Sequence, residues 1–342
     1  MLIFRLVDQW LRPMGRVRAR MRLGRGVIDD TVPWVFIHGG TPALMVSCGN
    51  DNTLVLAVTG LVWNCGKGEH GRLGHRDETN KMILTFIETG DRKGVDITLI
   101  VAGGLHSMAL EATGAVWTWG FGASGQLGHN ILENRFVLTI MEREAFNMHK
   151  VVSLTAGRVH SVAVTMEGEL WVWGSGYFRS LGLGDQMNRK KPTLIGTDTA
   201  LGESHVLTES CGFFYTLAMT KDGALWTFGM DEQGKLGHND HNNRLVPTRV
   251  EVQHFDKANV ISAADAYYHP ATVIDDGTLF TWGRGDQSKG LGHASGMPMW
   301  VPTRVDPSLM GGARIGPCHK LQSDGGRTHR ALSQTAAPWY LP

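Results

Sequence analysis

The 342-residue sequence holds fifteen histidines, a residue type that first suggests a metal site. Eight of them occupy two positions of a repeating pattern: His75, His129, His238 and His293 at one, and His106, His160, His269 and His329 at the other. A repeated position lies in a different structural unit each time, so its copies do not converge on one ion as metal ligands must. We therefore expect imidazoles that bond to the backbone of turns, with no metal site and no cofactor.

Two glycine-rich segments, 66–71 and 120–125, fit the GxGxxG fingerprint of dinucleotide-binding proteins. That fingerprint needs a helix N-terminus directly after the glycines to hold a pyrophosphate. Both segments lie between expected strands and recur with the repeat, so we interpret them as turns. The sequence contains no Gly-x-Ser-x-Gly elbow, HExxH or P-loop, and catalysis by side chains therefore has little support.

Composition narrows the class of protein further. A hydrophobic share of 42% and eleven tryptophans exclude a disordered chain, and 44 glycines without a collagen period predict many tight turns. No stretch of ~18 apolar residues occurs, so we expect no membrane span. Four cysteines without a CxxC pair favour a reducing, intracellular location in the cytoplasm or nucleus. Seven arginines in residues 1–26 leave a mitochondrial presequence as an alternative.

A five-fold repeat organises the sequence. A four-residue motif that begins with an aromatic residue and ends in glycine recurs at 63–66, 117–120, 171–174, 226–229 and 280–283. The first positions of successive copies are 54 or 55 residues apart. A Leu-Gly element follows each copy, and a turn of small residues precedes it. About four short strands per repeat, with no helical period between them, is typical of a β-propeller blade. We expect Pro192, Pro247 and Pro302 to begin the outermost strands, where a missing N–H is tolerated.

The two ends of the chain complete the scheme. Residues 325–329 repeat the turn element, but no aromatic hairpin follows them. Near the other end, apolar residues alternate with arginines over 16–23. We infer that the N-terminal strands complete a blade begun by residues 311–335 and so close the ring. The prediction is one all-β, six-bladed propeller over residues 16–335, between an N-terminal segment (1–15) and a C-terminal tail (336–342).

At these residues the chain resembles the regulator of chromosome condensation repeat family. Its repeats carry Gly-Gly-x-His-Thr, Gly-x-x-Trp-x-Trp-Gly and Gly-x-x-Gly-Gln-Leu-Gly-His, and residues 125–129 are the best copy here. The family usually has seven blades, so six is a departure. Its ultraviolet-sensing members carry Gly-Trp-Arg-His-Thr turns. Residues 104–106 and 158–160 read Gly-Leu-His and Arg-Val-His instead, so we do not expect photoreception.

Candidate partner-binding residues lie in the turn before each second strand. In exchange factors of this family, acidic and histidine residues of such turns contact a small GTPase on one face. The resemblance carries this role to Asp51, His106, His160, Asp265, His269 and His329. The competing interpretation is that the histidines cap turns.

Two further sets complete the candidates. Met299 and Trp300 would either anchor a partner or pack against the neighbouring blade. Arginines at the start of the chain would bind chromatin or nucleic acid: Arg16, Arg18, Arg20 and Arg22. Their strict alternation with apolar residues fits an outer strand with solvated arginines equally well.

The sequence therefore predicts a non-catalytic propeller that binds a protein partner, as a monomeric ring or as a subunit of a larger assembly. Guanine-nucleotide exchange on a Ran-like small GTPase is the alternative that the resemblance implies. In it, Asp51 would compete for the phosphate-loop lysine of the GTPase. The uniform repeat spacing leaves no long insertion to act as a wedge, which favours the scaffold.

Overall fold

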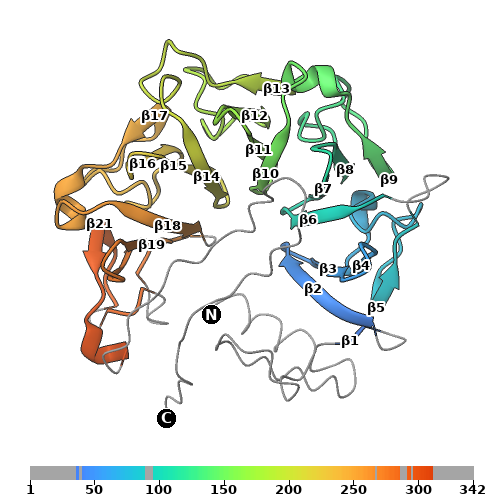
Figure 1. Cartoon of the computed structure of the whole chain (residues 1–342), viewed down its shortest axis with the longest axis horizontal. Helices are drawn as coiled ribbons and strands as arrows, with labels where there is room; N and C mark the ends of the chain where they lie inside the picture. Colours follow the sequence, from blue (N-terminus) through green and yellow to red (C-terminus); the bar gives the residue numbers. More distant parts are fainter. Residues whose placement is uncertain are drawn as a thin grey trace.

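The computed structural model describes residues 36–37, 41–88, 95–265, 268–285, 291–293 and 296–310. Their strands form five antiparallel sheets arranged around a common centre (Figure 1). The first blade comprises β1 (Phe36–Ile37), β2 (Thr41–Cys48), β3 (Asn52–Ala57), β4 (Val62–Gly66) and β5 (Lys81–Phe86). The second comprises β6 (Ile97–Ala102), β7 (His106–Glu111), β8 (Val116–Gly120) and β9 (Arg135–Ile140).

The other three blades have the same order. The third comprises β10 (Val151–Ala156), β11 (His160–Thr165), β12 (Leu170–Gly174) and β13 (Arg189–Leu194). The fourth comprises β14 (Val206–Cys211), β15 (Tyr215–Thr220), β16 (Leu225–Gly229) and β17 (Arg244–Arg249). The fifth comprises β18 (Val260–Asp265), β19 (Pro270–Ile274), β20 (Leu279–Gly283) and β21 (Met299–Arg304). Short 3-10 helices lie in the connections: η2 (Glu69–Gly71), η3 (Arg143–Phe146), η4 (Val252–Phe255) and η5 (Pro307–Met310).

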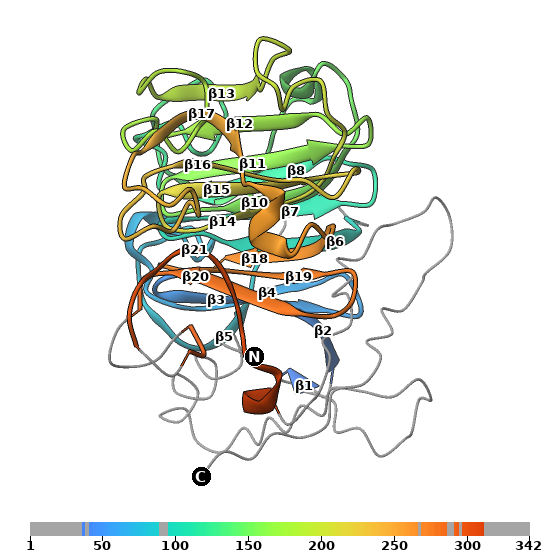
Figure 2. The same cartoon turned by 90° about the vertical axis from the view of Figure 1, so that its left-hand side faces the viewer.

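The strands run from one face of the ring to the other (Figure 2). We call the face with the first turn and the long third loop of each blade the loop face. It carries turns 49–51, 103–105, 157–159 and 212–214 and loops 67–80, 121–134, 175–188 and 230–243. The opposite face, with the short second turns and the connections between blades, is the hairpin face. The expected sixth blade and the closure of the ring fall on residues outside the described part.

The core lies between neighbouring blades, because both faces of the middle strands are covered. Every residue of β11 and of β12 is buried, which requires the apolar run that the sequence supplies there. Three tryptophans of the repeated motif are 0% exposed: Trp119, Trp173 and Trp282. Each indole Nε1 donates to a backbone oxygen 47 residues earlier, in the preceding blade. The repeat therefore encodes the contact between blades as well as the blade itself.

The expected position of the prolines is wrong by a few residues. Pro192 lies inside β13, and the matching prolines of β17 and β21 are placed in the same way. The register of β12 with β13 shifts between Val172 and Gly174, opposite this part of the strand. A proline that lacks the N–H fits such an irregularity on an edge strand without losing a ladder bond.

Within the described residues, no helix is both long and apolar enough to cross a membrane.

Candidate interaction face

A chain of hydrogen bonds ties the second blade to the third, beginning next to the first turn of the second blade. The hydroxyl of Ser161 donates to the backbone oxygen of Gln126 at 2.9 Å, and His106 Nε2 lies 2.7 Å from the same hydroxyl oxygen. Because a serine hydroxyl has one proton, His106 must be the donor in the second bond. Trp173 Nε1 donates to the same Gln126 oxygen at 2.9 Å. His106 therefore joins the second blade to the third.

The arrangement recurs at the neighbouring boundaries. His160 Nε2 lies 3.1 Å from Thr216 Oγ1, whose hydroxyl donates to the backbone oxygen of Ser180 at 3.1 Å. Between the first two blades, Asn52 takes the place of the histidine, and its amide donates to Ser107 Oγ at 3.3 Å. His106 and His160 are both 0% exposed. These two predicted partner residues thus face the interior, because their imidazoles are used as bonds between blades.

Burial also sets the protonation of these imidazoles. Burial lowers the pKa of His106 to about 3, with a smaller contribution from His160, and lowers the pKa of His160 to about 4. Both rings are therefore neutral at physiological pH, as the hydrogen-bond chain requires.

At the boundary of the fourth and fifth blades a tyrosine replaces the histidine. Tyr215 is 0% exposed, and its pKa lies well above the usual value because of burial, the charge of Asp265 and their hydrogen bond. Asp265, a predicted partner residue, is half-buried, and its backbone N–H donates to Ser210 Oγ at 3.0 Å. His269 is half-buried. The other predictions, His329 and the arginines at 16, 18, 20 and 22, lie outside the described residues.

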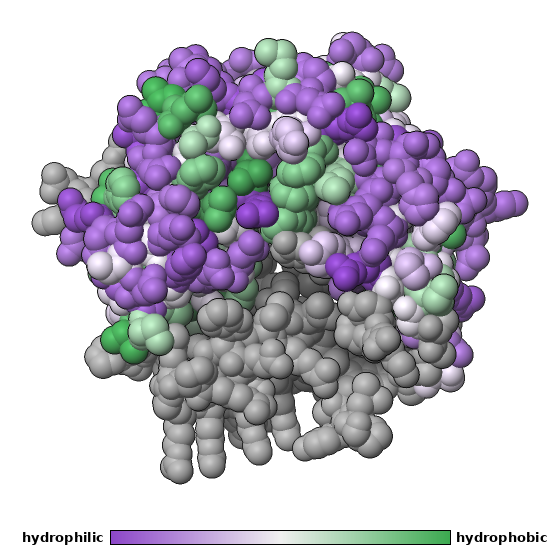
Figure 3. Space-filling view, turned by 180° about the vertical axis from the view of Figure 1, so that it is seen from behind, coloured by the Kyte–Doolittle hydropathy of each residue, from purple (hydrophilic) through white to green (hydrophobic). Residues whose placement is uncertain are grey.

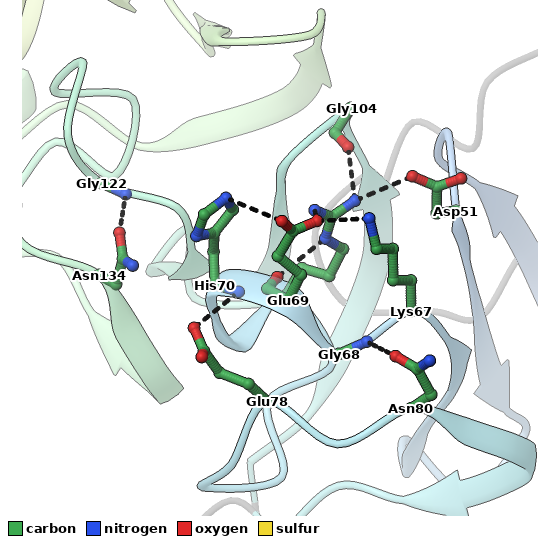
Figure 4. A network of polar contacts seen from close by, with 11 residues as sticks. Asp51, Lys67, Gly68, Glu69, His70, Glu78, Asn80, Gly104, Gly122 and Asn134 are labelled. Carbon is green, nitrogen blue, oxygen red and sulfur yellow. Dashed lines mark hydrogen bonds and ion pairs between the residues drawn. The ribbon is translucent and has the colours of Figure 1, made fainter.

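Asp51 is the predicted partner residue that lies in a charged cluster on the loop face (Figure 4). Its carboxylate accepts a hydrogen bond from Arg72 Nη1 at 3.3 Å, and its side chain is 43% exposed. Arg72 itself is 1% exposed, and Nη1 also donates to the backbone oxygen of Gly104 in the second blade at 3.3 Å. A buried guanidinium thus holds a half-exposed carboxylate at the boundary between two blades.

Loop 67–80 supplies the rest of this cluster. Glu69 pairs with Arg72 Nη2 at 3.3 Å and with Lys67 Nζ at 2.6 Å. The hydrogen bond and charge of Lys67 hold the pKa of Glu69 below its usual value. Lys67 and Glu69 are 50% and 46% exposed, so charges of both signs are available at the surface. We call Asp51, Lys67, Glu69 and Arg72 the charged cluster.

One member of this cluster can be recognised from the sequence. Arg72 occupies the place that Gln126 holds in the best copy of the repeat, so it is a residue that departs from the pattern. Lys67 and Glu69 lie in a segment interpreted only as a turn. The pairing of Arg72 with Asp51 joins residues 21 positions apart, and sequence spacing alone does not predict it.

A second group of side chains lies on the loop face between the third and fourth blades. Phe178 and Phe214 stack with ring centroids 3.8 Å apart, and Tyr177 packs edge-on against Phe178 at 4.7 Å. The guanidinium of Arg158 lies 4.8 Å from the ring centre of Phe213, within the range of a cation–π contact. Tyr177 is 68% exposed. In the view from behind, hydrophobic residues gather toward the middle of the ring, inside a mostly hydrophilic rim (Figure 3).

A buried cation on the same face lies next to Tyr215. Lys235, at the position of Arg72 in the fourth blade, is 1% exposed, and burial lowers its pKa. Its Nζ lies 5.6 Å from the ring centre of Tyr215 and 3.8 Å from Glu232. Nearby, burial raises the pKa of Asp231 to about 6.

Met299 and Trp300 both pack against the protein. Met299 contacts the core that contains Trp282, and the ring of Trp300 packs edge-on against His241 of the fourth blade at 4.1 Å. The Trp300 side chain is nevertheless 42% exposed. Met299 therefore fits the interpretation in which these residues pack against the protein. Trp300 also packs against it but keeps an accessible surface.

Within the described residues, one group brings metal-ligating atoms together: His149, Glu167 and Glu169 on the hairpin face. His149 Nδ1 lies 2.7 Å from Glu169 Oε2. The same carboxylate oxygen accepts from Trp171 Nε1 at 3.1 Å and from Thr165 Oγ1 at 3.2 Å. These bonds account for the position of Glu169 without an ion.

The repeated four-stranded blades and their shared hydrogen-bond chain define a β-propeller repeat protein. The model of the RCC1-like domain matches residues 17–332, and the chain belongs to this family. The ultraviolet-B receptor UVR8 of Arabidopsis thaliana is 31% identical over 77% of this chain and 58% of its own length. The mitochondrial RCC1 domain-containing protein RUG3 of the same plant is 30% identical over 76% of this chain and 58% of its own length. The chain thus spans less than two thirds of these relatives.

Solved structures show the same fold. Human WBSCR16 superposes with a TM-score of 0.68 at 23% identity, over 78% of this chain and 67% of the human one. Yeast RCC1 (Prp20), bound to Kap60, superposes with a TM-score of 0.63 at 20% identity, over 78% of this chain and 62% of the yeast one. At these identities the likeness concerns the fold.

Proposed function

We propose that this chain is a protein-interaction propeller without side-chain catalysis, and that it binds a protein partner through the loop face. The observation that carries the proposal is the charged cluster. The repeated polar residues form bonds between blades. Asp51 and Lys67 depart from the repeat, and they and Glu69 each keep about half of the side chain exposed. Residues on loops that a rigid scaffold holds in place are the usual means of recognition.

The aromatic group between the third and fourth blades supports the same face. Aromatic and arginine side chains are enriched among the residues that dominate binding energy. Phe214 and Arg158 belong to first turns, and Tyr177 belongs to a third loop, so all three point to the loop face. A partner that covered both groups would span the first four blades.

Nucleotide exchange on a Ran-like small GTPase is the second candidate, and the accessible carboxylate of Asp51 favours it. The yeast protein Prp20p has been studied for its binding to Gsp1p and histones. In this chain Asp51 already accepts a hydrogen bond from Arg72, so it would have to leave this partner to compete for a GTPase lysine. That requirement makes exchange the weaker candidate.

Affinity capture with quantitative mass spectrometry tests the proposal. The wild-type chain is compared with a Lys67→Ala/Glu69→Ala variant of the charged cluster and with an Arg143→Ala/Glu144→Ala variant, which removes two exposed charges of opposite sign from the hairpin face. We expect a partner that the first variant loses and the second keeps. Equal capture by all three proteins would contradict the proposed face.

Release of fluorescent GDP from a panel of Ran-like and Rho-like GTPases tests the alternative. Acceleration by the wild-type chain that Asp51→Ala abolishes would establish exchange. No acceleration, together with a partner captured through the charged cluster, would establish the scaffold.

A further inference from the structure

A cavity of about 290 Å³ lies on the hairpin face between the third and fourth blades. Residues 167–170 form one wall, and residues 197 and 201–206 of the connection to the next blade form the other. Five apolar side chains line it: Leu170, Leu194, Ile195, Leu201 and Val206. The polar part of the lining includes Glu167, Glu169, Glu203 and His205. Its volume is at the lower end of the range for ligand sites, so it suits a single side chain or a ligand of similar size.

The repeat explains why a cavity exists at this boundary. In two other connections a phenylalanine lies five residues before the first strand of the next blade: Phe146 and Phe255. Phe146 packs edge-on against Trp173 at 5.7 Å. Leu201 holds the matching position before Val206 and lacks the aromatic ring. The connection is also one residue longer than the other two. This boundary therefore has less side-chain volume and a wider loop.

The carboxylates of the lining depart from the repeat as well. Glu169 stands where the second and fourth blades have Ala115 and Ala224, and Glu203 stands where the other connections have Met148 and Lys257. The residues that line the cavity include three glutamates and no lysine or arginine. An apolar wall below an acidic rim is thus specific to this boundary.

The charge of the rim is partly balanced already. His149 pairs with Glu169 at 2.7 Å and lies 4.0 Å from Glu167. Partial burial raises the pKa of Glu169, but the bonds from His149 and Trp171 outweigh it, so the pKa is lowered and the group is ionised. Glu167 keeps 41% of its side chain exposed, and Glu203 is exposed. At least two carboxylates remain for an additional cation.

We propose that this cavity binds an alkylammonium group, with its aliphatic stem against the apolar wall and its charged end at the glutamates. Lysine side chains have this amphipathic form, with an apolar stem and a charged head. The shared chemistry comes from two sources, a lysine of a protein partner or a small free amine. The site lies on the face opposite the charged cluster and does not depend on the function proposed there.

Ligand-observed NMR titrations of the full chain, in buffer with EDTA, test the site. The probes are n-butylammonium, n-butanol and butyrate, which share one stem and differ in the charge of the head. We expect butylammonium to bind at least tenfold more tightly than the other two. Nα-acetyl-lysine N-methylamide distinguishes the sources. Binding tighter than that of butylammonium would indicate a lysine of a protein, and weaker binding would indicate a free amine.

Two variants and a control complete the design. Leu201→Phe restores the residue of the other connections, so it should fill the cavity, abolish binding and leave the fold intact by circular dichroism. Glu203→Gln removes an exposed charge and should weaken binding severalfold, whereas Glu133→Gln on the loop face should not. Unchanged binding in a folded Leu201→Phe protein, equal affinity for butyrate, or binding that requires added Zn²⁺ would overturn the proposal.

Discussion

The imidazole Nε2 of His106 lies 2.7 Å from the hydroxyl oxygen of Ser161, which is 55 residues further along the chain in the next blade. In the sequence the repeated histidines resemble a set of metal ligands. In the structure this one holds two neighbouring sheets together. His160 makes the matching bond to Thr216, so two boundaries between described blades are held in this way. We expect the stability of the fold to depend on these bonds, and this expectation is testable.

Removal of the Ser161 hydroxyl should destabilise the protein. Ser161→Ala leaves the buried His106 Nε2 without its acceptor, and an unsatisfied buried polar group costs about 1–3 kcal/mol. Urea denaturation measures the change in the free energy of unfolding. Thr193→Ala is the matched control, because its hydroxyl bonds locally to the Lys191 oxygen on an edge strand. Equal losses in the two variants would contradict a special role of the bond between blades.

Acidification should destabilise the fold below pH 6.5. Burial lowers the pKa values of His129, His160 and His238 to about 4 and that of His106 to about 3. The unfolded chain takes up protons near pH 6.5, whereas the folded chain does not. The stability from each histidine is complete above pH 6.5 and is lost, by about 1.4 kcal/mol per pH unit, as the pH falls toward the folded pKa.

Thermal unfolding between pH 7.5 and 4.5 measures this slope. His106→Asn gives the second blade the residue that the first blade has as Asn52. It should reduce the change of stability with pH by the contribution of one histidine. Asp231 acts in the opposite sense, because burial raises its pKa to about 6 and its contribution is lost as the pH rises from 3.8 to 6. A melting temperature independent of pH over this range would contradict the neutral, buried histidines.

The glycine that ends the aromatic motif should not tolerate a side chain. Gly120 has φ +105°, and a Cβ there would lie 2.9 Å from the Cα of His106. We expect Gly120→Ala to cost roughly 2–4 kcal/mol, from strain and from the clash. Gly184 also has a positive φ, of +82°, but a Cβ there would meet only Val246 at 3.9 Å. Gly184→Ala should therefore cost about 1 kcal/mol, and an equal loss in both would show that the clash contributes nothing.

Arg72→Gln should affect binding more than folding. Glutamine is the residue that the second blade has at this position, and the backbone oxygen of residue 72 would still accept from Trp119 Nε1. Asp51 loses its cation, whereas Glu69 keeps Lys67 at 2.6 Å, and both carboxylates are nearly half exposed, so we expect a loss of about 1 kcal/mol in stability. Urea denaturation and affinity capture of the partner measure the two effects. A loss above ~3 kcal/mol, with capture unchanged, would assign Arg72 to the fold alone.

Much of the fold follows from the sequence because local and repeated signals agree. Glycines mark the ends of β12 and of its counterparts, and the apolar runs between them match strands buried on both sides. The outermost strands were harder to place. Pro192 reads as a strand start by its missing N–H, but the register shift opposite β13 accommodates it within the strand.

The site was less predictable, because its geometry depends on contacts between blades. The alternation of residue types does not show that His106 faces Ser161, since the two are 55 positions apart. Asp51 was found because it departs from the repeat, and Arg72 departs from it in the same way. Their contact needs the fold of loop 67–80, which brings a buried guanidinium under the turn that carries the carboxylate.

The partners of the hydrogen bonds between blades are synthesised at different times. The Trp119 indole meets an acceptor 47 residues earlier, whereas His106 waits for a hydroxyl 55 residues later. A ribosome that adds about 5–20 residues per second needs roughly 3–11 s to deliver that partner. During this interval the newest sheet is joined on one side only. The acceptors that a blade offers to the next blade are thus synthesised before the partners that complete its own bonds, so contacts between blades become available in one direction along the chain.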